Sequence, residues 1–150
     1  MTYSTVTTTR DETAPLRRMR VWTRRVLSVL AGVVAIFVLS SATDLALEAT
    51  GVLPGGPLFD TGLLLLATAY RIIFSVLASC IVARLAPDHP MRHALAFGAV
   101  GVVLSTVGVI VNAQMQLGAT WYPLLLVAVA LPCAWCGGKL FQLTARRAVQ

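Results

Sequence analysis

The sequence predicts an all-α membrane protein, a bundle of four transmembrane helices with both termini in the cytoplasm. Of its 150 residues 57% are hydrophobic and only 12% are charged, whereas about a quarter of the residues in a soluble domain are charged. Four apolar runs are long enough to cross a hydrocarbon core, which takes about 20 residues. Eleven of the twelve Lys and Arg lie outside these runs or within their last turn, and four spans place all eleven on one side, which the positive-inside rule assigns to the cytoplasm.

The net charge of +6 would also suit a nucleic-acid-binding protein. The basic residues, however, flank the apolar runs instead of forming one patch, so we expect the lipid bilayer as the partner and no nucleic acid. The expected bundle occupies residues 21–142, with spans at about 26–49, 61–86, 94–111 and 121–141.

The N-terminal residues 1–20 are expected to form a disordered, basic cytoplasmic tail, because the first fourteen are polar and lack apolar periodicity. The following basic segment, with Trp22, suits anionic headgroups at the start of the first span. A cleavable signal peptide is an alternative for this region. It would have an unusually long basic segment, and its removal would discard Asp44 and Glu48.

The second span follows a Gly/Pro-rich connection and is expected to begin with Asp60 as its N-cap. A tight turn, in which Asp88 or His89 is the expected cap, leads to the third span. That span has no charge, and small residues recur in it every three or four positions, which predicts a close-packing face. These are Gly98, Gly101, Ser105 and Gly108.

The fourth span begins with Trp121 and Tyr122, an aromatic pair typical of the membrane interface, followed by a proline that the first turn tolerates. Pro132 lies inside the span and is expected to bend it. Residues 143–150 are expected to be a short cytoplasmic tail.

The candidate site is built around Arg71, the one charge in the interior of the second span. Its Cα lies ten residues from Thr61, about 15 Å into the membrane, where an unpaired cation is costly. The first two spans are antiparallel neighbours, and helical side chains lean toward their own N-terminus. We therefore predict an ion pair of Arg71 with Asp44, with Glu48 as a second acceptor and with Tyr70, Thr43 and Ser75 as hydrogen-bonding neighbours.

Three cysteines form a second, weaker candidate site. Cys133 and Cys136 make a C-x-x-C motif, and Cys80 is expected at a similar depth. The motif is similar to those of two membrane thiol oxidoreductase types, the quinone-linked disulfide oxidases and the vitamin K epoxide reductases, but here it lies toward the reducing side and lacks a second cysteine pair. A zinc site formed by Cys133, Cys136 and either His89 or His93 is the other hypothesis. Buried small side chains are the favoured interpretation.

Four strings of the sequence resemble a group of short, four-span bacterial inner-membrane proteins with no assigned activity. They are ATDLALEATGVLP at 42–54, ATAYR at 67–71, ARLAPDHPMRHAL at 83–95 and WYPLLLVAVALPCAW at 121–135. The resemblance implies a location in the bacterial inner membrane and the four-span architecture, and it transfers no site residue.

The leading expectation is a non-enzymatic membrane protein, structural or accessory to a larger assembly or homo-oligomer, with no cofactor and no resident metal. No soluble catalytic motif is present in the sequence. The first alternative is a small transporter or channel subunit that uses the Arg71 cluster for an ion, proton or small anion, and the second is the thiol oxidoreductase. A dry, sealed cluster would favour the structural role, and a solvated one would favour transport.

Overall fold

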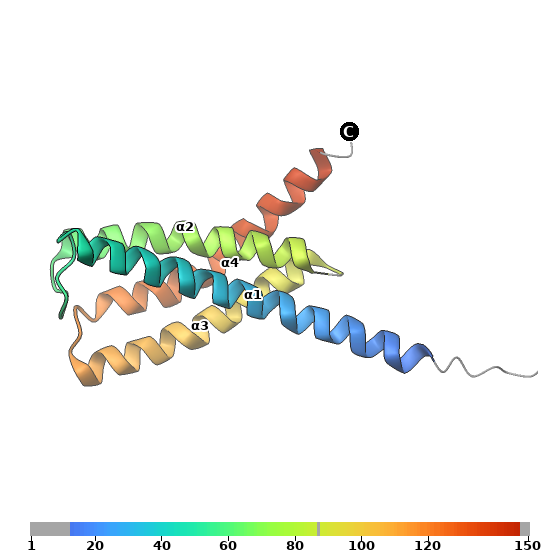
Figure 1. Ribbon diagram of the computed structural model, residues 1–150, viewed down its shortest axis with the longest axis horizontal. Helices are drawn as coiled ribbons and strands as arrows, with labels where there is room; N and C mark the ends of the chain where they lie inside the picture. The colour runs from blue at the N-terminus through green and yellow to red at the C-terminus, as the bar shows by residue number, and fades with distance from the viewer. Residues whose placement is uncertain (1–12, 87, 148–150) are drawn as a thin grey trace, which may run out of the picture.

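The chain folds into four long helices joined by short connections. The computed structural model describes residues 13–86 and 88–147, and Figure 1 shows their arrangement. The helices are α1 (Thr13–Ala49), α2 (Thr61–Leu85), α3 (Pro90–Met115) and α4 (Trp121–Arg147). Each is long and apolar enough to cross a membrane. Within the described ranges no strand forms, and the only bridge joins Leu58 to Gly118. The prediction of an all-helical bundle of four helices, each long and apolar enough to cross a membrane, is confirmed.

The expected disorder of residues 13–20 is wrong, because a helix includes them, and a helix also continues into the expected C-terminal tail. Residues 13–20 belong to α1, since Pro15 falls in its first turn and the arginines that follow favour helix. Residues 143–147 belong to α4, whose last turn carries two arginines that complement the helix dipole. The expected disorder of residues 1–12 and the tail at 148–150 lie outside the described residues.

The ends of the helices follow the local chemistry. Asp60 caps α2, its Oδ1 accepting from the Leu63 N–H at 2.9 Å, as predicted. Gly51, with φ of 72°, ends α1 in a Schellman motif in which its own N–H donates to the carbonyl of Glu48. Of the two residues expected to cap α3, His89 is the one at its start. His89 holds the N-cap position without a side-chain hydrogen bond, and the following Pro90 needs no partner at N1.

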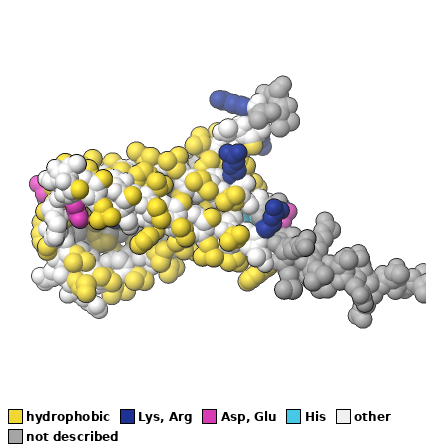
Figure 2. Space-filling model, in the orientation of Figure 1, with side chains coloured by type: hydrophobic (Ala, Val, Ile, Leu, Met, Phe, Trp, Pro, Cys, Tyr) yellow, Lys and Arg dark blue, Asp and Glu magenta, His cyan; other side chains and the backbone are white. Residues whose placement is uncertain are grey.

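The charged side chains divide the bundle into two ends (Figure 2). The basic end contains the turn between α2 and α3, and at the loop end lie the connections 50–60 and 116–120. Arg25 of α1 pairs with Asp88 in that turn at 3.2 Å. Figure 2 shows the dark-blue side chains gathered at the basic end. On its way to that end α4 changes direction, and its C-terminal part diverges from the other helices (Figure 1), as expected from Pro132.

Glycines make the half of the bundle next to the basic end tight. A Cβ added to Gly32 of α1 would lie 2.2 Å from Val82 of α2, and one added to Gly137 of α4 would lie 2.5 Å from the carbonyl oxygen of Val76. The hydroxyl of Ser79, fully buried, donates to the Ala134 carbonyl at 2.7 Å and so ties α2 to α4. Small residues permit such close approach of helices in a membrane bundle.

The small-residue face of α3 packs closely along only part of its length. A Cβ on Gly98 would lie 2.6 Å from Ala134 of α4, but one on Gly108 would meet nothing within 4 Å. The expected continuous packing face is therefore wrong in its second half. There the missing side chains leave space, because α1 and α3, which meet near Gly32 and Phe97, separate toward the loop end (Figure 1).

Candidate functional site

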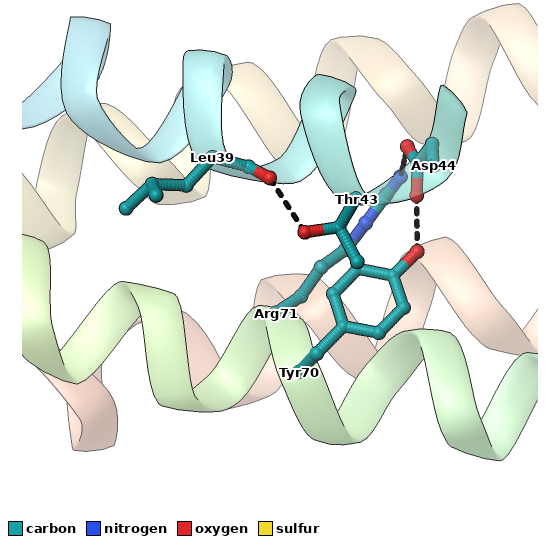
Figure 3. A network of polar contacts seen from close by, with 5 residues as sticks. All are labelled: Leu39, Thr43, Asp44, Tyr70 and Arg71. Carbon is teal, nitrogen blue, oxygen red and sulfur yellow. Dashed lines mark hydrogen bonds and ion pairs between the residues drawn. The ribbon is translucent and has the colours of Figure 1, made fainter. Parts of the chain in front are cut away.

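The predicted ion pair between the first two helices is present. Arg71 extends from α2 toward α1, and its Nη2 lies 2.8 Å from Oδ2 of Asp44 (Figure 3). The other carboxylate oxygen, Oδ1, accepts a hydrogen bond from the hydroxyl of Tyr70. Both oxygens of Asp44 are thus used by neighbouring residues of α2, which fixes the two helices in register.

Tyr122 is a part of the cluster that sequence reasoning did not assign to it. The Arg71 guanidinium carbon lies 5.7 Å from the centre of the Tyr122 ring, within the range of a cation–π contact. Tyr122 stands in the first turn of α4, so the guanidinium reaches from the middle of α2 well toward the loop end. The aromatic pair at the start of α4 was a signal for an interface anchor, and nothing in its spacing pointed to Arg71.

The other residues predicted to contact Arg71 do not hydrogen-bond to its guanidinium. The hydroxyls of Thr43 and Ser75 each donate at 2.8 Å to a carbonyl one turn earlier in their own helix. Glu48 is exposed and its carboxylate makes no hydrogen bond or ion pair with any described residue, so its predicted role as second acceptor for Arg71 is not found. The guanidinium of Arg71 is held by Asp44 and Tyr122 instead.

The pair is only partly shielded. The side chains of Arg71 and Asp44 are each 30% exposed, whereas Nε of Arg71 is buried and has no hydrogen-bond partner among the described residues. A buried N–H without an acceptor costs roughly 1 to 3 kcal/mol. The Arg71 side chain is therefore partly exposed, while one of its donors is buried and unsatisfied.

Two cavities meet at the ion pair. The lower cavity, of about 460 Å³, extends from Asp44 and Arg71 toward the basic end, between α1 and α3. The upper cavity, of about 390 Å³, extends from the same two residues to the loop end, where the connections form its rim. Both lie within the range of volumes typical of small-ligand sites. Figure 2 shows the hollow at the loop end beside an acidic side chain.

The linings of the two cavities differ. Serines of three helices give the lower cavity its polar groups in an otherwise apolar wall, and they are Ser40, Ser41, Ser75 and Ser105. The upper cavity carries Glu48, Asn112 and Tyr122. The small-residue pattern of α3 could have signalled the space, because Gly101, Ser105 and Gly108 line it, but the pattern by itself also fits a packed interface.

The cysteine site gains no support from the geometry. Cys133 is buried and Cys136 exposed, no disulfide forms, and neither cavity includes a cysteine. The zinc alternative is wrong for the part of the chain that is described, since no three His, Cys, Asp or Glu side chains there are grouped to hold a metal ion.

Comparison of the chain with protein-family models, with curated proteins and with solved structures finds no match.

Proposed function

We propose that this protein is a non-enzymatic multi-pass membrane protein that takes a small ligand into the cleft at the Arg71–Asp44 pair, as a small transporter, channel or binding subunit. The supporting observation is that two cavities meet at this pair and leave both of its side chains partly exposed. If the pair served only to hold two helices together, the protein would be more stable with the pair fully enclosed by other side chains, because unshielded charges in lipid are costly.

The proposal includes the orientation of the protein in the membrane. Seven described Arg and Lys residues toward the basic end support its assignment to the cytoplasm under the positive-inside rule, and the bacterial inner membrane is the proposed location. They are Arg24, Arg25, Arg84, Arg92, Lys139, Arg146 and Arg147. The upper cavity then opens toward the outer compartment. A reporter that is active only in the cytoplasm, fused to the C-terminus, should be active; an inactive fusion beside an active outer-side reporter would reverse the orientation.

Thiol labelling tests the cleft directly. In a variant with all three native cysteines replaced by alanine, Ser105→Cys places a thiol in the lower cavity and Thr106→Cys places one on the exposed outer face of the same helix. Thiols react as thiolates, which form in water and not in hydrocarbon. Ser105→Cys should react with a charged maleimide added from outside, and Thr106→Cys should not. Labelling of neither, or of both at one rate, would refute a hydrated cleft.

A further inference from the structure

The lower cavity opens sideways toward the surface that lipid would cover. Phe37 of α1 and Leu104 of α3 both line it, and they are 71% and 54% exposed, so they stand at its lateral rim. The seam between the two helices is closed farther along, where Gly32 packs against Phe97. A molecule dissolved in the bilayer can therefore enter between α1 and α3 without passing through the loop end.

The polarity of the cleft changes along the helix axes. Toward the basic end its walls are largely apolar, with Val33, Ile36 and Phe97 among them. Toward the loop end lie the ion pair and Glu48. This order matches an amphiphile of the adjoining leaflet, with its polar head toward the membrane surface and its chain toward the centre.

The charged side chains at the loop end indicate which charge the head group of such an amphiphile would carry. All residues of this end are described, and their ionisable side chains other than tyrosine are three acids and one base, namely Asp44, Glu48, Asp60 and Arg71. With Arg71 neutralised by Asp44 and Asp60 occupied as a helix cap, Glu48 is the charge without a partner. An anionic head would face Glu48 and Asp44, while Nε of Arg71 is buried away from it.

We infer that the cleft binds a single-chain amphiphile with a cationic ammonium head, the head beside Glu48 in the upper cavity and the chain in the lower one. This inference rests on the proposed function and names its ligand class. Lipid tails are as apolar as the cavity wall, so burial of the chain adds little driving force within a membrane. Selectivity therefore comes from the head and its attraction to Glu48.

Protection of the Ser105→Cys thiol from the maleimide provides the test. In nanodiscs, dodecyltrimethylammonium should slow labelling, whereas dodecyl phosphate and the chainless tetramethylammonium should not at equal concentration. Glu48→Gln should weaken the protection about five-fold, the size expected for one partly exposed charge pair. Asp88→Asn, the same loss of charge at the basic end, should leave it unchanged.

Each other outcome overturns the inference. Equal protection by dodecyl phosphate would show that the head charge is not read, and equal protection by tetramethylammonium would show that the chain is not used. An unchanged result in Glu48→Gln would remove the assigned acid. Labelling that no amphiphile slows would refute this ligand class while leaving the hydrated cleft and the proposed function intact. Elution of each variant as the same monodisperse species checks folding.

Discussion

The two halves of this bundle use small residues in opposite ways. Near the basic end, Gly32, Gly98 and Gly137 bring helices so close that an added Cβ would collide with a neighbour. Near the loop end, Gly108 and Ser105 border open space, and the helices are linked there by an ion pair. A stripe of small residues on a membrane helix thus predicts either contact or cavity, and the facing helix decides which.

The largest expected effect comes from filling the tight half. Gly137→Ala should lower the free energy of unfolding by about 1 to 3 kcal/mol, because its Cβ would meet backbone and Ser79 of α2. Gly108→Ala, the matched change in the open half, should be neutral or stabilising by up to about 1 kcal/mol, since alanine favours helix. Reversible unfolding in mixed micelles measures both. Equal losses would erase the distinction between the halves.

In the open half, the substitution expected to destabilise the protein most is one that removes a charge. Arg71→Leu should cost about 2 kcal/mol, below the range for fully buried pairs because both side chains are 30% exposed, and it leaves Asp44 without its cation. The double variant Arg71→Leu with Asp44→Leu should recover most of that loss. The same unfolding experiment compares the three proteins. If the double variant is as damaged as the single one, the pair does not hold α1 and α2 together.

A smaller effect is expected for the hydroxyl that bridges the same helices. Tyr70→Phe should destabilise by about 1 kcal/mol, since it removes one hydrogen bond to Asp44. Thr43→Val removes a hydroxyl that bonds only within α1 and should change stability by less than about 0.5 kcal/mol. Should Thr43→Val prove the more damaging, the bridge between helices is not what the hydroxyl of Tyr70 supplies.

The smallest effect is expected at the exposed contact of the basic end. Arg25→Gln should cost less than about 1 kcal/mol, because the Arg25–Asp88 pair is about half exposed. The difference from the unaltered protein should vanish in about 1 M salt, where the screening length falls to about 3 Å. A loss that is large or independent of salt would mean that this contact, and not the glycine packing, closes the tight half.

Much of this architecture could be predicted from local signals. The lengths of the apolar runs predict the helices, Asp60 predicts the start of α2, and one intramembrane cation required an acid within reach. The pair with Asp44 followed because antiparallel helices lean their side chains in calculable directions.

The sequence could not predict how helices that are not consecutive in the chain are placed relative to one another. The two cavities arise from the separation of α1 from α3. The contact of Tyr122 with Arg71 depends instead on α4 lying beside α2. No single-helix pattern encodes the distance between two non-consecutive helices. The extension of α1 back to Thr13 was missed for a different reason, because polar composition was taken as disorder although arginine favours helix.

Contact with water inside the cleft tests the central claim most directly. Nitroxide labels at Ser105→Cys and Thr106→Cys, in nanodiscs prepared in D₂O, report deuterium within a few ångströms through pulsed electron spin-echo modulation. A hydrated cleft at the Arg71–Asp44 pair predicts a clearly deeper deuterium modulation at residue 105 than at residue 106, its neighbour on the outer face of α3. Modulation equally shallow at both positions would contradict it.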